Sequence, residues 1–456
     1  MSQPPKPRAS RKEIFGWAMF DFANSSYTTV IVTVVYCVTF TKLIVGADAN
    51  GEFGLGNLLW SLAIAISYGL VVFTAPVLGA VMDFAAAKKK FLFASYLVTV
   101  TGTMLLGFAS PGHYVVAMLL IILSNFGFAT GESFASSFLP DLGPRKDLGK
   151  ISGFAWGLGY FGGLASTMLV ISLGAGSATE FAKARWAGPI TGVFFLVAAI
   201  PTFLWLKERG HPQSLPPGRG YLSIGFGRLA STFRALGSFR DLAVFLGSMF
   251  FAMGGLAIIV SFSFLYGDQV LKWSDSTRVL MFVLTQLTAA GGAVLFGFIQ
   301  DRIGAKRTYQ ITLWLWIICV LAIWQVDHIA AAVNGLLGTQ WQTEYVFLVL
   351  GCVAGLGIGS TQSASRGMVG ILAPESKAGE FFGFWGLSGK LAAIFGLAVF
   401  GLLQYRIGLR YAIVLCAVLF FLAWLGSLPV NEHRGREAAE GGAEMGEGGS
   451  KMGDRR

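Results

Sequence analysis

The chain has 456 residues, of which 54% are hydrophobic, only 13% are charged and 60 are glycine, and its formal net charge is +10. A soluble domain rarely combines so much apolar content with so little charge, so this composition excludes an ordinary soluble protein. The basic residues are spread over separate loops and are not interleaved with aromatic residues on one face. This spread excludes nucleic acid as a partner and favours anionic lipid headgroups.

Twelve apolar segments are each long enough to cross the hydrocarbon core of a bilayer, which needs about 20 residues. The first segment follows a basic lead and has no small-residue cleavage site, so we expect a retained helix and not a signal peptide. The composition and the segments predict an all-α integral membrane protein with twelve transmembrane helices. The predicted spans are 14–46, 57–82, 91–110, 113–139, 150–174, 187–206, 241–266, 277–300, 308–327, 344–373, 379–404 and 407–430.

A linker separates the first six predicted spans from the last six. It contains HPQSLPPGRG, which cannot be helical, and then a basic stretch from Arg228 to Arg240 that we expect to form a short helix at the membrane surface. The tail is rich in glycine and charge, which is typical of disorder. The predicted parts are a basic tail (1–13), a first six-helix half (14–206), a cytoplasmic linker (207–240), a second six-helix half (241–430) and a disordered cytoplasmic tail (431–456).

The loops on the side of the amino terminus hold most of the Lys and Arg residues. Cytoplasmic loops carry such an excess, so we expect both termini to be cytoplasmic. We expect a multi-pass protein of the plasma membrane, the inner membrane of the cell, and a monomer.

Two short loops carry glycine, an acid and basic residues between apolar segments. GFIQDRIGAKR runs from Gly297 to Arg307, and GAVMDFAAAKKK, with Gly79 and Asp83, is a weaker echo of it in the first half. The chain is therefore predicted to be a duplication of one six-helix unit with pseudo-symmetric halves. The residues of interest are Gly79, Asp83, Gly297, Asp301, Arg302, Gly304, Lys306 and Arg307.

Several patterns that often indicate an enzyme are absent or have a simpler explanation. GLGYFG, from Gly157 to Gly162, fits the dinucleotide pattern, but no strand precedes it, and its glycines are better explained by close helix packing. The four cysteines have no paired spacing and the four histidines are scattered, so we expect neither a metal site nor a catalytic constellation. No GxxxxGK[ST] motif for ATP is present. We therefore expect no enzyme and no cofactor.

The two halves place opposite charges at matching positions. Glu132 lies eight residues before Pro140, and Arg366 lies eight residues before Pro374. The later segments Gly153–Tyr160 and Gly383–Lys390 also match, which makes Tyr160 and Lys390 counterparts.

Four ionisable residues lie deep inside predicted spans. At 1.5 Å per residue, Lys390 lies ~16 Å from the inner surface, Glu132 and Arg366 ~12 Å, and Asp21 ~10 Å. Each costs at least ~2.5 kcal/mol there on insertion scales unless it is paired or faces water. One interpretation is that these charges form ion pairs that fix helix packing or latch one conformation. The other is that Arg366 and Lys390 attract an anionic part of a solute while Asp21 or Glu132 titrates to couple transport to protons.

Neutral polar residues near these charges, such as Asn24, can add hydrogen bonds to a solute or to helix packing. The predicted substrate and coupling residues are Asp21, Asn24, Glu132, Trp156, Tyr160, Gln362, Ser365, Arg366 and Lys390.

The loops resemble those after the second and eighth helices of the major facilitator superfamily of secondary transporters. GWAMFDFANSSY (16–27), SSFLPDLG (136–143), ISGFAWGLGYFGG (151–163) and STQSASRGMVGILAPESKAGEFFGFWGLSGK (360–390) are further similar to the unknown major facilitator family, which includes the vacuolar amino-acid effluxer of autophagy. The resemblance implies two six-helix halves that rock about a central site. One departure is Met253-Gly254, where many members carry Asp-Gly.

Within this resemblance, the Asp83 and Asp301 loops are expected to be inner gates. Each Asp would lie near a helix terminus or a basic neighbour of the other half and would stabilise the outward-open state. The basic residues of the second loop, such as Arg302, can equally act only as positive-inside anchors.

The leading hypothesis is a proton-coupled secondary transporter that moves a small polar or zwitterionic solute by alternating access. Amino acids are favoured by the family resemblance alone, and peptides, sugar acids and drugs fit the same charges. The alternative is a transporter-like sensor or lipid-handling membrane protein that carries no solute. The expected partners are therefore a small solute, a proton or another coupling ion, and anionic lipids at the cytoplasmic face.

Overall fold

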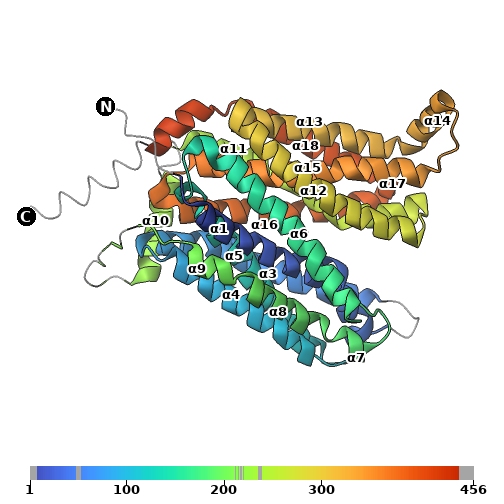
Figure 1. Cartoon of the computed structure of the whole chain (residues 1–456), viewed down its shortest axis with the longest axis horizontal. Helices are drawn as coiled ribbons and strands as arrows, with labels where there is room; N and C mark the ends of the chain where they lie inside the picture. Colours follow the sequence, from blue (N-terminus) through green and yellow to red (C-terminus); the bar gives the residue numbers. More distant parts are fainter. Residues whose placement is uncertain are drawn as a thin grey trace, which may run out of the picture. The chain divides into compact units, whose positions relative to one another are not determined.

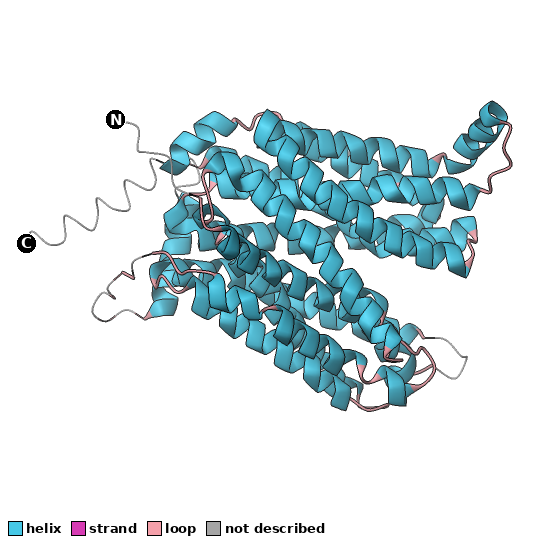
Figure 2. Ribbon diagram, in the orientation of Figure 1, coloured by secondary structure: helices cyan, strands magenta, loops and turns pink. Residues whose placement is uncertain are grey.

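A computed structural model describes the chain except for residues 1–7, 48–52, 211, 214, 216, 217, 219, 235–238 and 441–456. The described residues form helices joined mostly by short loops, as Figures 1 and 2 show, and contain no strand. Twelve helical segments are long and apolar enough to cross a membrane, which confirms the predicted fold class. They are Arg11–Val45, Gly54–Phe84, Lys88–Phe108, Tyr114–Asp141, Arg145–Ser172, Phe181–Trp205, Arg240–Leu271, Ser276–Ile303, Ala305–Trp324, Thr343–Leu372, Glu375–Ile407 and Leu409–Ser427.

The chain divides into two compact units that do not coincide with the two halves of the sequence. Unit 1 comprises residues 1–144, 158–234 and 375–387, and unit 2 comprises residues 145–157, 235–374 and 388–456. The beginning of the fifth span therefore packs within unit 2, and the beginning of the eleventh span packs within unit 1. The predicted gate loops contact these two exchanged helix ends.

Unit 1 is a bundle in which α4 packs on α5 and α8, α3 packs on α5, and α1 packs on α8 and α9. Aromatic residues fill its core, such as Trp17, whose indole nitrogen donates to the carbonyl oxygen of Ala135 at 2.7 Å. Its α-helices are α1 (Arg11–Ser26), α2 (Tyr36–Val38), α3 (Gly54–Phe84), α4 (Lys88–Leu105), α5 (Tyr114–Ser136), α7 (Phe181–Ala184), α8 (Ala187–Ala198), α9 (Ile200–Trp205), α10 (Tyr221–Arg234), the later part of α6 (Leu148–Ser172) and the first part of α16 (Ala378–Ile407).

Unit 2 is built in a similar way, with α12 packed on α15, α11 on α18, and α13 on α15 and α18. Small residues allow the closest approach, because a Cβ on Gly359 would overlap the carbonyl oxygen of Ala289. Its helices are α11 (Arg240–Tyr266), α12 (Asp275–Ile303), α13 (Ala305–Trp324), α14 (Val326–Leu337), α15 (Thr343–Leu372), α17 (Leu409–Ala412), α18 (Val414–Ser427), a helix over 432–440, and the remaining parts of α6 and α16.

Two parts outside the spans differ from the expectation. The predicted disordered tail 431–456 begins with a helix over 432–440, and its remainder lies outside the described residues. The linker helix α10 (Tyr221–Arg234) begins before the predicted stretch 228–240, whose residues 235–238 lie outside the described residues, and it packs on α3, where Gly225 lies against Val77 and Val81. Both segments are held by contacts that composition alone does not indicate.

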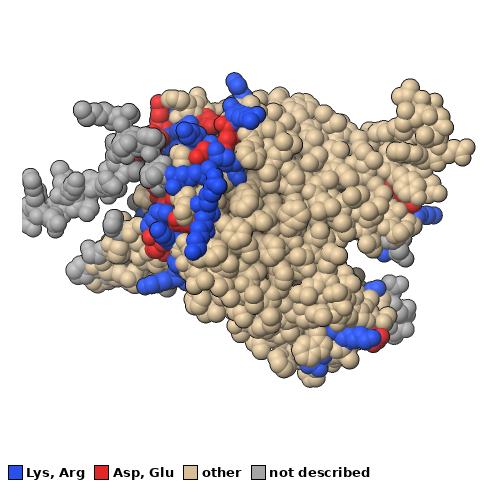
Figure 3. Space-filling model, in the orientation of Figure 1, with Lys and Arg blue, Asp and Glu red and all other residues tan. Residues whose placement is uncertain are grey.

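The charges lie where a membrane protein requires them. Figure 3 shows Lys, Arg, Asp and Glu gathered at the ends of the helices, while the flanks of the helices in this view are almost free of charge. Large apolar side chains such as Phe73 (79% exposed) cover these flanks, as expected for lipid-facing surfaces.

Candidate transport site and inner gates

Asp83, near the end of α3, binds the beginning of α16. Its carboxylate accepts hydrogen bonds from the backbone nitrogens of Gly379 (3.0 Å) and Glu380 (2.9 Å). Unpaired N–H groups and the helix dipole make a helix amino terminus attractive to a carboxylate. Gly79, one turn earlier, allows this approach, because a Cβ there would overlap the carbonyl oxygen of Gly379. The contact joins the second and eleventh spans, which belong to different halves of the sequence.

Asp301, near the end of α12, makes the matching contact in unit 2. Its carboxylate accepts from the backbone nitrogens of Gly149 (3.0 Å) and Lys150 (3.2 Å) at the beginning of α6. Gly297 allows the approach, because a Cβ there would lie 2.7 Å from the carbonyl oxygen of Gly149. The eighth and fifth spans are thus joined by the same chemistry as the second and eleventh.

The loops after the two Asp residues each contain a residue with a positive φ angle. Gly304 and Ala86, each three residues after its Asp, have positive φ angles of 94° and 47°. Such a conformation suits glycine, so the second loop has the less strained sequence. The side chains of Arg302 and Arg307 are exposed, whereas the Lys306 ammonium donates to the carbonyl oxygen of Leu428 at 2.7 Å.

Three predicted site residues lie on packed helices of unit 1. Asp21 on α1, Glu132 on α5 and Tyr160 on α6 are all half-buried. Their neighbours bring the helices together: Gly131 lies against Phe20, and Gly159 lies against the backbone of Asp21. Glu132 also adjoins the contact of Ser133 with Gly386 on α16. The sequence neighbours of these three polar side chains therefore lie on packed helices, inside segments that cross the membrane.

Arg366 is the most deeply buried of the predicted charged residues, at 1% exposure. Its guanidinium donates to the Ser152 hydroxyl (Nε, 3.2 Å) and to the Ser152 carbonyl oxygen (3.1 Å), and it lies 5.0 Å from the ring centroid of Trp156. The Ser152 hydroxyl in turn donates to the carbonyl oxygen of Ser363. Arg366 thus links the tenth span to the fifth, close to the Asp301 contact.

The other predicted residues of unit 2 fall into two groups. Gln362 and Lys390 are half-buried, whereas Ser365 is fully buried and its hydroxyl donates to the carbonyl oxygen of Gln362 at 3.0 Å. Lys390 follows Ser388, whose hydroxyl donates to the Leu246 carbonyl oxygen of α11. Gly254 on α11, in the pair that departs from Asp-Gly, packs against Gly396 on α16.

Asn24 in unit 1 is 7% exposed, and its side-chain oxygen has no hydrogen-bond partner among the residues that the structure describes. Gln300 in unit 2, next to Asp301, is 3% exposed, and within the described part of the chain neither of its amide atoms has a hydrogen-bond partner. Its side chain fills the space between Gly149 and Gly367. An unsatisfied buried amide costs free energy, so both residues are candidates for a role beyond packing. Gln300 was not predicted from the sequence.

The sequence analysis also missed a clamp at the predicted inner end of unit 1. The segment after α9 supplies Arg209, whose guanidinium binds both carboxylate oxygens of Glu13 at 2.6 and 2.8 Å. It also supplies Glu208, which accepts from the backbone nitrogen of Lys89 at the start of α4. Hydrogen bonds to Glu13, together with its negative charge, raise the pKa of Arg209. The first, third and sixth spans are thereby tied together.

The same clamp recurs in unit 2, in the segment after α18. Arg434 binds both carboxylate oxygens of Asp241 at 2.7 Å, and Glu432 accepts from the backbone nitrogens of Ala305 (3.0 Å) and Lys306 (3.2 Å). The available sequence signal was a Glu followed within two residues by an Arg, directly after the last span of each half. The clamps show that the duplication extends to the segments beyond the spans.

Twelve spans with these duplicated end contacts define a membrane transporter of the major facilitator superfamily type. The fold is similar to that of the human organic anion transporter MFSD10 (TETRAN), with a TM-score of 0.68 and 16% identity, covering 93% of this chain and 100% of that chain. It is also similar to the proton:xylose symporter XylE, with a TM-score of 0.66 and 14% identity, covering 91% and 94%. Identities this low show the likeness of fold alone.

The chain belongs to the family described as "Vacuole effluxer Atg22 like", whose sequence model matches residues 59–440. A relative is the uncharacterized MFS-type transporter YxiO of Bacillus subtilis, 26% identical over 419 residues, covering 90% of this chain and 92% of that protein. Another is autophagy-related protein 22 of Yarrowia lipolytica, 25% identical over 488 residues, covering 96% and 80%. The family resemblance predicted from the motifs is confirmed.

Proposed function

We propose that this chain is a secondary transporter that moves a small polar or zwitterionic solute by alternating access, coupled to protons. The observation that carries the proposal is the presence of half-buried Asp21, Glu132 and Lys390 within membrane-crossing helices. Charged groups in such helices are costly and are retained where they serve a substrate or proton path. The membership in an effluxer family supports transport over a sensor or lipid-handling role.

We assign Lys390 to the anionic part of the solute and Asp21 or Glu132 to the proton. An amino acid carries such an anionic part in its carboxylate. Arg366 serves a different purpose in this proposal, because its full burial and its bonds to Ser152 suit a residue that holds the tenth span on the fifth.

Asp83 and Asp301 serve as inner gates in the same proposal. Each carboxylate makes a contact between spans of different sequence halves. Each contact includes hydrogen bonds to backbone nitrogens at the start of a helix, which can break while the rest of that helix stays folded. The clamps of Glu13 with Arg209 and of Asp241 with Arg434 stay intact and keep each set of spans rigid. Opening at the inner face then includes the loss of the two Asp contacts and of the Arg366 link.

The same proposal places the chain in the plasma membrane as a monomer, with cytoplasmic termini and anionic lipids at the cytoplasmic face. The excess of Lys and Arg in the predicted inner loops supports the orientation. A relative from the bacterium Bacillus subtilis, matched over 90% of this chain, supports a location other than a vacuole.

A thermal-shift screen of the purified protein against amino acids, peptides, organic acids and drugs at two pH values tests the proposal. A ligand that binds the folded state raises Tm. We expect a pH-dependent shift that Lys390→Ala abolishes and Arg406→Ala, at an exposed basic residue of the same helix, retains. A shift that survives Lys390→Ala refutes the assigned site, and the absence of any shift favours a sensor or lipid-handling role.

A further inference from the structure

The hairpin between the ninth and tenth spans carries an amphipathic helix at the level where the membrane ends. The ninth span has 20 residues, enough to cross about 30 Å, so α14 begins where the hydrocarbon core ends. Figure 1 shows α14 leaving the end of α13 at an angle to the neighbouring helices of unit 2. A tilted amphipathic helix at this depth suits the boundary between hydrocarbon and water.

Polar contacts hold this hairpin in place. Asp327 at the start of α14 forms an ion pair with Arg410 of α17 at 2.7 Å. Asn334 closes the loop, because its amide nitrogen donates to the Trp341 carbonyl oxygen (2.9 Å) and its amide oxygen accepts from the Trp341 backbone nitrogen (2.8 Å) and the Thr339 hydroxyl (2.9 Å). The apolar residues that follow are therefore presented in a fixed position.

The exposed face of the hairpin is strongly apolar. Leu336 is 86% exposed and Leu337 is 61% exposed, so neither side chain is covered by the helix bundle. Trp341 and Tyr345, at 46% each, continue this face onto α15, where Val349 (54%) lies one further turn into the span. The face is thus continuous with the lipid-facing surface of the tenth span, and a tryptophan and a tyrosine lie at the boundary, where membrane proteins place them.

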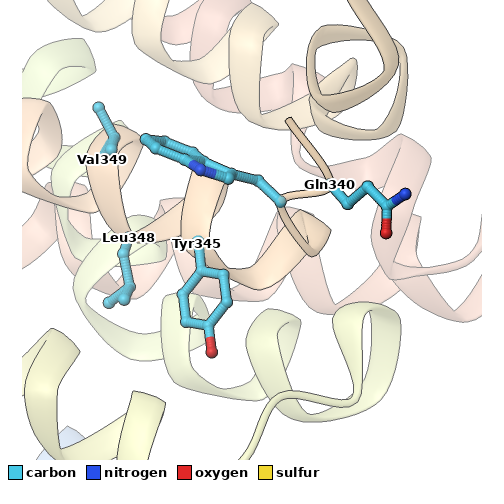
Figure 4. Close-up of a pocket in the computed structure, with 5 residues that line it drawn as sticks. Gln340, Tyr345, Leu348 and Val349 are labelled. Atoms are coloured by element: carbon cyan, nitrogen blue, oxygen red, sulfur yellow. The ribbon is translucent and has the colours of Figure 1, made fainter. Parts of the chain in front are cut away.

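A cavity of about 450 Å³ lies in the corner between the hairpin and the tenth span (Figure 4). Trp341, Tyr345, Leu348 and Val349 line it, and Gln340 adds an amide at its edge. None of these five residues is charged. The lining offers apolar contacts and a few neutral hydrogen-bonding groups, which match the ester region and the upper acyl chain of a phospholipid and do not select for the charge of its headgroup.

We propose that α14 lies on the membrane and that this corner binds a phospholipid. The lipid belongs to the leaflet at the end of unit 2 that carries α14, and the C-terminal segment lies at the other end. The apolar face of α14 rests on the acyl boundary, and the cavity receives the upper part of one lipid. This contact anchors the end of the ninth and tenth spans at a fixed depth. The proposal is independent of the transported solute, so its failure leaves the proposed transport untouched.

Site-directed spin labelling in phosphatidylcholine nanodiscs tests the position of α14. Leu336→Cys carries one label, and Ala331→Cys, which is exposed about 140° away on the same helix, carries the control label. Both variants are made in a chain whose four native cysteines are replaced. We expect the label at 336 to be several-fold more accessible to oxygen and less accessible to a water-soluble nickel chelate than the label at 331. Equal accessibility at the two positions overturns the proposal, and so does spin–spin broadening, which identifies a second copy of the chain as the occupant.

Fluorescence quenching tests the cavity itself. The difference between the wild-type protein and Trp341→Phe isolates the emission of Trp341 from that of the other tryptophans. We expect phosphatidylcholine brominated near the top of its acyl chains to quench this emission at least two-fold, and brominated phosphatidylglycerol to quench it equally. Absence of quenching refutes the lipid site, and quenching by the anionic lipid alone refutes recognition by an uncharged lining.

Discussion

Replacement of Asp83 by Asn perturbs one inner gate while it keeps the size of the side chain. The carboxylate accepts two backbone hydrogen bonds at the start of α16, and an amide can accept only one of them and carries no charge. A hydrogen bond to a charged group contributes ~1.5–3 kcal/mol, and the interaction with the helix dipole adds ~0.3–1 kcal/mol. The substitution should therefore weaken the closed inner gate by about 2 kcal/mol, which is a shift of ~30-fold in the equilibrium between closed and open states.

Cysteine labelling measures this shift directly. Met82 is fully buried and its methyl group lies at Gly379, so Met82→Cys reports whether the two helices separate. With the native cysteines replaced, we expect a maleimide to label Cys at this position at least ten-fold faster when Asp83 is Asn. Asp141→Asn is the matched control, because Asp141 binds Lys88 (2.9 Å) and joins two spans of the same sequence half. An unchanged labelling rate in the Asp83 variant, or an equal rise in the control, would refute the gate.

Further substitutions test the other contacts. Asp301→Asn should also speed maleimide labelling at Met82→Cys, and the double variant with Asp83→Asn should be labelled faster than either single variant. Slower labelling in the Asp301→Asn variant would show that the two gates do not open together. Arg209→Met should lower the free energy of unfolding by about 2 kcal/mol. This loss is smaller than the ~3–5 kcal/mol of a fully buried ion pair, because the Arg209 side chain is 33% exposed. An unchanged Tm would show that the clamp is not stabilising. Gln300→Met removes an unsatisfied amide and should raise stability by about 1 kcal/mol, whereas a lower Tm would show that this amide has a partner in solution.

The spans and the duplication could be predicted because both leave local signals. Apolar runs of about 20 residues mark each span, and the Gly79–Asp83 and Gly297–Asp301 spacing places the small residue and the acid one turn apart on a helix. The partner of each Asp could be narrowed to a helix terminus or a basic residue. The structure shows a helix terminus in both cases, and Asp301 also lies 3.8 Å from the ammonium of Lys150, a basic residue of the other half.

The clamps could not be predicted because each joins residues nearly 200 positions apart. Arg209 looks like an ordinary positive-inside residue, and Glu13 looks like the acid of a first helical turn, until the fold brings them together. The contacts of the Arg366 side chain were equally hidden. Its depth in a span indicated a buried charge, but only packing against Ser152 and Trp156 shows that its guanidinium is used within the protein.

Uptake into proteoliposomes tests the central claim most directly. Protein reconstituted with an imposed proton gradient is supplied with radiolabelled amino acids and other small zwitterions, and Lys390→Ala serves as the matched inactive variant. The account predicts saturable accumulation that a protonophore abolishes and that Lys390→Ala lacks. Accumulation of no solute by a correctly folded and oriented protein, or uptake that is indifferent to both the gradient and Lys390, would contradict it.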